Sequence, residues 1–340
     1  MRSWKGSWVL LAVLALLGAA AGAEAAYKAE YKASIVVGPA GPWGESAIRF
    51  ADLLKERTGG RIAVKNYHAG QLFAGKQTNE FTLLAQSVGD FAFASTINWS
   101  PQVKELNLFA LPFMFSSYKA LDAVEAGEPG KKLFQLIESK GIVPLAWGEN
   151  GFRQLTNSKR RVAKPADLEG LKIRVVGSPI FIDTFRALGA NPVNMNWGEA
   201  QTAFQQGTVD GQENPVVTVI VPSKLWTTQK YVTLWNYTID PLILGVSKLS
   251  WAAFSAEDKA IVKKTAEEVM AWQKQGARAG LDTSSESLDV LKQNGMELFA
   301  LSAKDIQAFR AKTKPVYEKW AKEIGPDLVK AAETLAAAAK

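Results

Sequence analysis

The sequence predicts an α/β protein of two lobes, each a mostly parallel sheet flanked by helices. Two separate stretches of the 340-residue chain follow the order strand–helix–strand–helix–strand, which builds a parallel sheet. Strand-like segments after them are suited to cross between the lobes as a hinge. A long helical segment from about residue 256 is suited to span both lobes. A crevice between two such lobes is a usual place for a small ligand.

The first 26 residues have the layout of a secretory signal peptide. Arg2 and Lys5 precede the apolar run Trp8–Ala21, and small residues follow at 23–26. This run is short for a membrane span, which disfavours the alternative of an uncleaved N-terminal anchor. The chain has no Cys, so an exported protein must fold without disulfides. We therefore expect export to a bacterial periplasm.

The first part of the remaining chain supplies one sheet. Its expected strands, residues 33–38, 61–67 and 91–95, show the alternation or apolar clustering of buried strands. Helices are expected at 45–57 and 76–87. Residues 106–117 form an apolar stretch interrupted by Pro112, which we interpret as core. A further strand is expected at 142–147, followed by the loop-like sequence GENGFRQLTN.

Residues 167–215 supply the second sheet. Strands are expected at 171–176, 191–196 and 208–210, and helices at 180–188 and 199–206. Ser178 and Pro179 have the residue types of an N-cap and a first helical turn. Arg174 lies towards the carboxyl end of the first of these strands, where parallel sheets bind ligands. A guanidinium beside the N–H groups of a helix start is suited to hold a carboxylate.

The remaining elements are expected to connect the two lobes. Residues 216–221 are β-branched, and 224–230 look helical. Residues 231–235 and 242–246 are strand-like on either side of Asp240 and Pro241. These are the segments expected to cross between the lobes as a hinge.

Helices dominate the last third of the chain. Ser255 and Asp258 resemble a capping box that opens a helix, expected to continue past Gly276 to residue 293. A short strand at 296–300 precedes a second capping box, at Ser302 and Asp305. The predicted division assigns residues 27–149 and about 241–278 to lobe I, and residues 150–240 and about 279–340 to lobe II.

The missing residue types exclude much catalytic chemistry. With no Cys and the single histidine His68, the chain has neither a thiol nucleophile nor a Cys/His zinc cluster. His68 has no nucleophile elbow near it in the sequence, so we interpret it as a structural loop residue. We predict no catalytic residue, no metal and no cofactor. Catalysis by carboxylates alone stays open, because no spacing singles out a pair among the 33 acidic residues.

The net charge of +7 indicates attraction for anions in general. Lys and Arg are scattered along the chain, and the longest basic cluster is residues 159–161. A nucleic-acid-binding surface needs a longer basic track. We therefore predict no nucleic-acid partner.

Two arginines are the leading candidates for a binding site. Arg153 follows the expected strand at 142–147, and Arg174 lies in the sequence LKIRVV. A planar guanidinium can hold a carboxylate through two hydrogen bonds, which Lys cannot. Asn214, in DGQENP, has the surroundings of a turn, but its amide could also bind an anion held by Arg174. Trp43 and Trp197 lie in expected strand–helix loops and could form a ligand wall.

At this point the sequence resembles a known family. The motifs DLEGLKIRV, ALGANPVNMNWGEAQTAFQQGTVDGQENP and GQL…VGDFAFAS are similar to those of DctP-type solute-binding proteins of TRAP (tripartite ATP-independent periplasmic) transporters. The resemblance implies a two-lobed periplasmic binding protein that closes on an organic acid and delivers it to a membrane permease. It also implies that Arg174 is the main carboxylate clamp, with Arg153 as the second arginine and Asn214 as the Asn of the ENP motif.

Compared with the family that it resembles, the chain has its own features. Members that bind sialic acid carry a glutamate where this chain has Ser95, so sialic acid is not expected. The sequence GQLFAGKQTN is closer to dicarboxylate-type receptors. Further contacts are expected from Trp43, Ser95, Trp197 and Asp240. The predicted ligand is a C4-dicarboxylate or a related hydroxy, oxo or sugar acid.

The favoured hypothesis is thus a monomeric, non-enzymatic receptor for a small carboxylate, with TRAP permease subunits as its partner. The enzyme alternative is an exported α/β hydrolase or lyase that uses acidic catalytic residues. It requires a pair of acidic side chains with perturbed pKa values in the crevice. A third class, a docking subunit for a sensor or scaffold, predicts no closure around a ligand.

Overall fold

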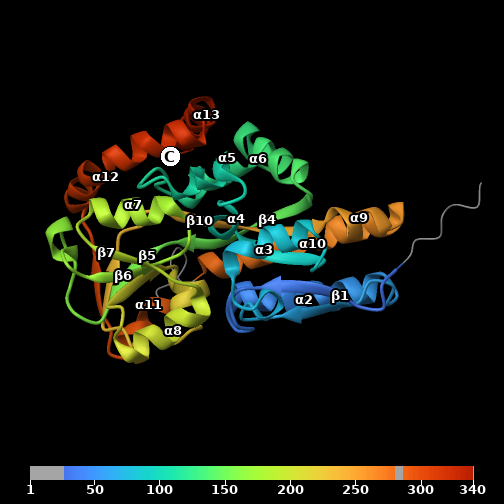
Figure 1. The fold of residues 1–340 in the computed structure, drawn as a ribbon, viewed down its shortest axis with the longest axis horizontal. Coiled ribbons are helices and arrows are strands. Elements are labelled where there is room, and N and C mark those ends of the chain that lie inside the picture. Colours follow the sequence, from blue (N-terminus) through green and yellow to red (C-terminus); the bar gives the residue numbers. More distant parts are fainter. Residues whose placement is uncertain (1–26, 280–285, 340) are drawn as a thin grey trace, which may run out of the picture.

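The computed structural model of the protein describes residues 27–279 and 286–339, so the predicted signal peptide lies outside the described residues. Two sheets flanked by helices make up the fold (Figure 1), which confirms the predicted α/β class. None of the helices in the described residues combines the length and apolarity needed to cross a membrane.

The first sheet has five strands. Their order is β2 (Val64–Tyr67), β1 (Tyr31–Ile35), β3 (Phe91–Ser95), β10 (Ile239–Ser247) and β4 (Ile142–Phe152). β1 pairs in parallel with β2 and β3, whereas β10 lies antiparallel between β3 and β4. β4 therefore points the same way as β1, β2 and β3. The carboxyl ends of these four strands and the amino end of β10 share one edge.

The second sheet has six strands. Their order is β11 (Glu297–Ala300), β9 (Tyr231–Leu234), β5 (Gln154–Asn157), β8 (Gly211–Asn214), β6 (Lys172–Val175) and β7 (Asn191–Asn194). β8, β6 and β7 are parallel neighbours, and β5 runs antiparallel to β8 and β9. As in the first sheet, one strand opposes the common direction.

Helices cover both sheets and form a separate C-terminal layer (Figure 1). The α-helices are α2 (Gly41–Arg57), α3 (Glu80–Ala85), α4 (Thr96–Trp99), α5 (Tyr118–Ala126), α6 (Glu128–Ser139), α7 (Pro179–Ala187), α8 (Trp197–Gln206), α9 (Lys248–Ala253), α10 (Ala256–Arg278), α11 (Glu286–Gln293), α12 (Ala303–Ile324) and α13 (Pro326–Ala338). α13 packs on α5, and α12 packs on α7 and on the 3₁₀ helix Lys104–Ala110. The C-terminal layer thus contacts elements assigned to both predicted lobes. The boundaries of these lobes stay a prediction.

Two neighbouring strand crossings join the sheets. The one between β9 and β10 confirms the predicted crossing strands, and the one between β4 and β5 was not predicted. β4 ends at Phe152 and β5 begins at Gln154, so only Arg153 separates a strand of one sheet from a strand of the other. β9 and β10 make the return crossing through residues 235–238. The backbone N–H of Arg153 donates to the carbonyl of Thr238 at 3.0 Å. The crossings are therefore held together as a pair.

The long helix α10 packs directly against the exposed edge of the first sheet. Gln273 accepts a hydrogen bond from the backbone N–H of Glu149 at 2.8 Å and donates to its carbonyl at 2.6 Å. These bonds satisfy edge groups that an unpaired strand would leave open. A Cβ on Gly148 would lie 2.2 Å from the Met270 Cε at the flexible end of its side chain, which shows how closely α10 packs on β4. α10 also contacts the π-helix Val216–Ile220 next to the second sheet.

Several expected elements differ from the structure. The strand expected at 208–210 is β8, which begins at Gly211. A Cβ at Gly211 would lie 2.2 Å from the Thr156 carbonyl of the neighbouring strand. Here glycine permits close strand pairing and does not mark a turn. The β-branched run 216–221 folds as a π-helix after Pro215, and 224–230 contains only a 3₁₀ turn at Leu225–Thr227.

The helix ends also refine the expectations. Ser302 and Asp305 form the predicted capping box, and Ser255 caps α10 by accepting from the Asp258 N–H. The helix opened by Ser255 is described to Arg278, α11 is a separate helix up to residue 293, and residues 280–285 lie outside the described residues.

Glu80 is a buried carboxyl that makes stability depend on pH. It accepts hydrogen bonds from the Ser34 Oγ at 2.6 Å and the Trp99 Nε1 at 3.2 Å. Burial raises its pKa to about 7, while both hydrogen bonds oppose the shift. The folded state therefore retains a proton that the unfolded state releases above about pH 4.5. This contribution to stability is present at low pH and is lost as the pH rises to about 7.

We predict that Glu80→Gln removes this loss. Between pH 5 and pH 8 the wild-type free energy of unfolding should fall relative to the variant, by on the order of 3 kcal/mol if the full shift is realised. Urea unfolding of both proteins at the two pH values measures the difference. Parallel pH profiles of the two proteins would contradict the prediction.

Candidate ligand-binding site

A small buried cavity lies where both sheets present the ends of their strands. Its volume is about 30 Å³. Its polar lining consists of Gln77, Ser95, Asn98, Asn150, Arg153, Arg174, Asn214 and Asp240, and its apolar lining of Val36, Val37, Trp43, Ile97, Val176, Trp197 and Val219. The seven residues predicted from the sequence are all in this set.

Strand direction explains why residues far apart in sequence meet here. Val36 directly follows β1, Ser95 ends β3, Val176 follows β6 and Asn214 ends β8. Ligands of parallel sheets bind beyond the carboxyl ends of the strands. Asp240 joins them because β10 is antiparallel, so its amino end lies beside the carboxyl end of β3.

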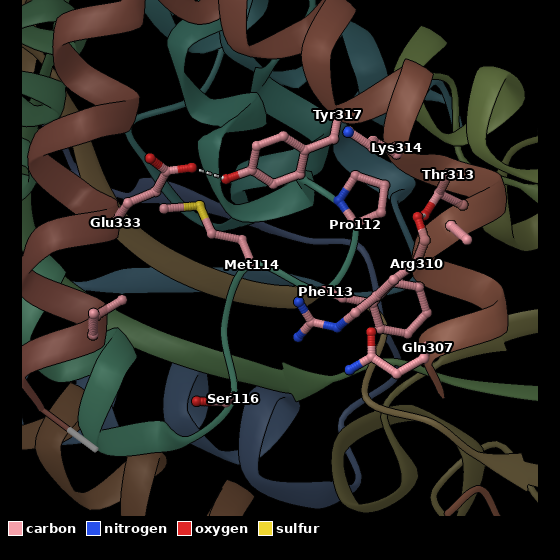
Figure 2. Close-up of a pocket in the computed structure, with 13 residues that line it drawn as sticks. Pro112, Phe113, Met114, Ser116, Gln307, Arg310, Thr313, Lys314, Tyr317 and Glu333 are labelled. Atoms are coloured by element: carbon pink, nitrogen blue, oxygen red, sulfur yellow. Dashed lines mark hydrogen bonds between the residues drawn. The ribbon is translucent and has the colours of Figure 1, made fainter. Parts of the chain in front are cut away.

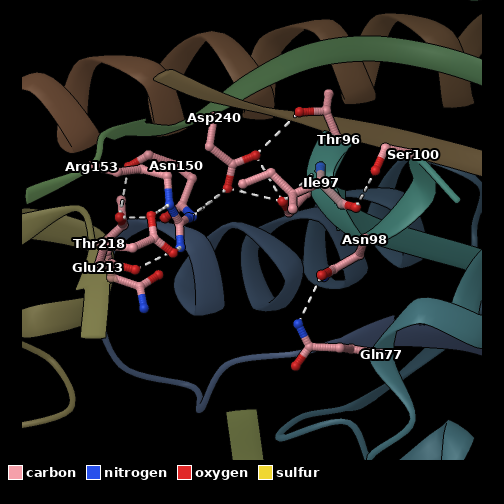
Figure 3. Close-up of polar contacts among 12 residues, drawn as sticks. Gln77, Thr96, Ile97, Asn98, Ser100, Asn150, Arg153, Glu213, Thr218 and Asp240 are labelled. Atoms are coloured by element: carbon pink, nitrogen blue, oxygen red, sulfur yellow. Dashed lines mark hydrogen bonds and ion pairs between the residues drawn. The ribbon is translucent and has the colours of Figure 1, made fainter. Parts of the chain in front are cut away.

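Arg153 is an ion-pairing residue at the crossing between the sheets (Figure 3). Its Nη2 donates to the Glu213 Oε1 at 2.8 Å and to the Glu213 carbonyl at 2.7 Å, and its Nε also donates to the Glu213 carboxylate. Its Nη1 donates to the Asp240 Oδ2 at 3.1 Å. Burial disfavours its charge, but Glu213 and Asp240 outweigh burial and raise the pKa of Arg153. Of its five N–H donors, four are thus committed to these two acids.

Asp240 accepts hydrogen bonds from donors on several elements. The Ser95 Oγ donates to its Oδ1 at 2.7 Å, and the Thr96 Oγ1 to the same oxygen at 3.2 Å. The Asn150 Nδ2 donates to its Oδ2 at 2.7 Å, beside Arg153. Burial raises the pKa of Asp240, and these four donors oppose that shift. A carboxylate surrounded only by donors acts as an anion.

Arg174 is the opposite case, a buried guanidinium that is largely unpaired. It is 2 % exposed, and its Nε donates to the Met195 carbonyl at 2.9 Å. Within the described part of the chain, its buried Nη2 has no hydrogen-bond partner. Burial lowers its pKa to about 10; Arg153 adds to this effect, whereas Glu213 opposes it. Arg174 therefore stays cationic at neutral pH and can still bind an anion.

The other predicted residues complete the wall. Trp197, the first residue of α8, lies under Arg174, with the guanidinium carbon 5.4 Å from the ring centroid. Trp43 lies in the first turn of α2 and donates its Nε1 to the Phe93 carbonyl at 2.8 Å. Both tryptophans are helical instead of lying in loops, because both helices begin earlier than expected. Asn214 lies in β8 instead of a turn, and its Nδ2 donates to the Gln212 Oε1 at 2.5 Å.

Gln77 is the most informative residue that the sequence analysis missed. Its Nε2 donates to the Asn98 Oδ1 at 2.8 Å, and its Oε1 accepts from the backbone N–H of Trp197 at 2.7 Å. It thereby connects α4, on the first sheet, with α8, on the second. A second connection joins the hydroxyls of Ser100 and Ser178 at 3.0 Å. No local pattern marks Gln77, because its role depends on a contact 120 residues away.

The structure also corrects the expected role of Ser178. It stands at the N-cap position of α7, but its side chain makes no capping hydrogen bond. Its hydroxyl instead donates to the Asn107 Oδ1 at 2.8 Å. This serine therefore bonds across to the neighbouring part of the molecule and leaves its own helix uncapped.

A larger hollow of about 510 Å³ lies elsewhere, between α12, α13 and residues 112–116 (Figure 2). It contains none of the predicted site residues. Its charged residues, Arg310, Lys314 and Glu333, are exposed to solvent, where water weakens their attraction for a ligand. We therefore place the candidate site at the buried cavity. In the described residues no group of three or more His, Cys, Asp or Glu could hold a metal ion.

Comparison with known proteins identifies the family. The sequence profile of the bacterial extracellular solute-binding proteins of family 7, DctP, matches residues 33–323. The chain belongs to the DctP family. Its members among the solved structures include periplasmic solute-binding proteins of TRAP transporters, which confirms the resemblance inferred from the motifs.

Two solved structures are particularly similar to this DctP-family protein. One, from Ralstonia eutropha H16, is a TRAP periplasmic solute-binding protein with bound (S)-2-hydroxy-2-methyl-3-oxobutanoate. It has 51% sequence identity and a TM-score of 0.90, and the match covers 92% of this chain and 99% of that one. The other, the sugar-acid-binding protein of Advenella mimigardefordensis in complex with galactonate, has 30% identity and a TM-score of 0.86, over 92% and 98% of the two chains.

Curated relatives agree with this assignment. The C4-dicarboxylate-binding periplasmic protein DctP of Rhodobacter capsulatus is 30% identical over 89% of this chain and 90% of its own length. The matches to an uncharacterised protein of Sinorhizobium fredii and a solute-binding protein of Verminephrobacter eiseniae span only 41% and 62% of those proteins.

The contrast between the two arginines predicts that their removal affects the stability of this DctP-family protein without ligand to very different extents. Arg153→Met leaves Glu213 and Asp240 buried without their cation, which should cost about 3–5 kcal/mol. Arg174→Met removes an unpaired buried charge and should change stability by less than about 1 kcal/mol or increase it. Urea unfolding of the three proteins measures both effects. Equal destabilisation by the two substitutions would contradict the assignment of separate roles.

Proposed function

We propose that the protein is a periplasmic receptor that captures a small organic-acid anion, with Arg174 as the main carboxylate clamp. One observation carries the proposal: the guanidinium of Arg174 is buried in the cavity, and its Nη2 lacks a hydrogen-bond partner among the described residues. A buried unpaired charge is unfavourable, so an incoming carboxylate would restore the missing pairing. The remaining N–H of Arg153 and the Asn214 amide flank the same anion.

The chemistry of related ligands supports an organic acid. The related structures hold (S)-2-hydroxy-2-methyl-3-oxobutanoate, galactonate and, in Sulfurospirillum deleyianum, succinate. All three compounds carry a carboxylate, which is the group that an arginine fork binds best. The common element of the proposal is therefore one carboxylate on Arg174.

Binding is coupled to closure of two lobes, residues 27–149 with about 241–278 and residues 150–240 with about 279–340. The crossing strands beside Arg153 are the hinge, and Gln77 and Ser100 close the lobes onto Trp197 and Ser178. A ligand favours closure only through contacts that it makes better in the closed state. The closed, loaded monomer then delivers its ligand to the TRAP permease in the membrane. Residues 1–26 act as the signal peptide for export.

The enzyme alternative has less support. It needs a pair of acidic residues free to exchange protons, but Glu213 and Asp240 both bind Arg153. Of these two acids only Asp240 lines the cavity. The family and its solved members are solute-binding proteins. Mass spectrometry of the ligand after release tests the point, since a receptor returns it unchanged.

Removing the clamp should abolish most of the affinity. We expect Arg174→Ala to weaken carboxylate binding by about 2–5 kcal/mol, because a buried charge-assisted pair is lost. Arg174→Lys should also weaken it, since an ammonium cannot form the two-pronged contact. Isothermal titration calorimetry with (S)-2-hydroxy-2-methyl-3-oxobutanoate, succinate and galactonate provides the measurement. Full-strength binding by the Ala variant would refute the clamp.

The Gln77 connection predicts a different effect. Gln77→Ala removes the hydrogen bond to the Trp197 N–H, which joins the lobes only when they close, so the affinity should drop about tenfold. Stability without ligand should change little in comparison. Small-angle scattering with and without ligand should show compaction in the wild type and less compaction in the variant. A ligand that binds without any compaction would argue against closure.

A further inference from the structure

We infer that Asp240 serves as an internal second carboxylate, which fills the partner position beside Arg153 and makes the site selective for monocarboxylates over dicarboxylates. This inference deepens the proposed function and depends on it. It names the class of ligand that the cavity accepts and the residue that imposes the choice.

The first step concerns which buried charges form ion pairs. The two guanidinium groups of the cavity wall, Arg153 and Arg174, face two buried carboxylates, Glu213 and Asp240. Both carboxylates bind Arg153, and within the described residues neither forms a hydrogen bond or ion pair with Arg174. Arg174 is therefore the cation of the cavity that is left to form an ion pair with a ligand, and it can pair with one carboxylate.

The second step concerns hydrogen-bond donors. A second ligand carboxylate needs several donors to replace its water. Ser95, Asn150 and the Nη1 of Arg153 could supply them, but all three donate to Asp240, at 2.7, 2.7 and 3.1 Å. An ionised carboxylate has about four acceptor sites, and Thr96 supplies a fourth donor at 3.2 Å. Asp240 thus already occupies the donors that a second ligand carboxylate would use.

The third step is the position of Asp240. It lines the cavity, whereas Glu213 is not among the lining residues. A second ligand carboxylate would meet the negative charge of Asp240 at close range in a buried site, where like charges repel strongly. The apolar side chains Val36, Val37, Val176 and Val219 instead suit an uncharged alkyl or acetyl group. The ligand is therefore expected to carry a single negative charge.

The test uses two ligands that differ by one charge. The monoanion (S)-2-hydroxy-2-methyl-3-oxobutanoate and the dianion 2-hydroxy-2-methylpropanedioate share a skeleton and differ in a CH₃ group that is replaced by O⁻. We expect calorimetry with the wild-type protein to show at least about 100-fold weaker binding of the dianion, because like charges meet in the closed site. Equal affinities for the two ligands would overturn the inference.

Two variants show whether Asp240 is the cause. Asp240→Asn keeps the size of the side chain and removes its charge from the cavity wall. It should improve binding of the dianion and so narrow the gap in affinity between the two ligands at least about tenfold. Glu213→Gln is the matched control, because it removes a carboxylate from the same arginine but not from the cavity wall. It should leave most of the gap in place. An unchanged gap in Asp240→Asn, or equal narrowing in both variants, would overturn the role of Asp240.

The outcomes separate this inference from the proposed function. If both ligands bind the wild type equally well and Arg174→Ala abolishes both, the clamp holds and the charge selectivity is wrong. If neither ligand binds, and succinate and galactonate do not bind either, the proposed function itself fails. Circular dichroism and thermal unfolding of each variant confirm that the compared proteins are folded. The comparison of the two ligands on the wild type needs no variant.

Discussion

The structure depends on one guanidinium placed between its two sheets. Arg153 is the single residue between β4 and β5, and it binds Glu213 on the second sheet and Asp240 on the first. Each of these charges would be costly to bury alone, and together they satisfy one another. Because the ion cluster lies at the strand crossings, the crossings and the wall of the cavity share the same residues.

This arrangement leaves the second arginine of the cavity available. With both buried acids bound to Arg153, the direct contacts of the Arg174 guanidinium in the described residues are the face of Trp197 and the carbonyl of Met195, and Glu213 favours its charge without a hydrogen bond. An aromatic face and a carbonyl stabilise a cation only partly. The fold thus keeps a desolvated cation at the meeting point of the two sheets. The ion pairs of the fold and the proposed binding of a ligand thus involve different arginines, although the sequence shows no difference between the two.

Much of the fold could be predicted because its signals are local. The strands β3 and β6, the helix α7 and the capping box at Ser302 follow from periodicity and from capping residues within a few positions. The errors arise where a distant partner decides the local structure. Gly211 has the local signal of a turn, but it lies in a strand because the Thr156 carbonyl approaches its backbone. The sequence GENGF looked like a loop, and it continues β4 because β10 pairs with it.

The sequence by itself determined the family, the α/β class and seven of the residues around the cavity, since residue types at strand ends carry that information. The tertiary structure decided what each residue does there. Arg153 and Arg174 have the same chemistry, and only the position of Glu213 and Asp240 relative to each of them makes one a structural ion pair and the other a free cation. Gln77 belongs to the site solely because the fold brings it to the amino end of α8. Electrostatic roles depend on distances between residues remote in sequence, and those distances exist only in the folded protein.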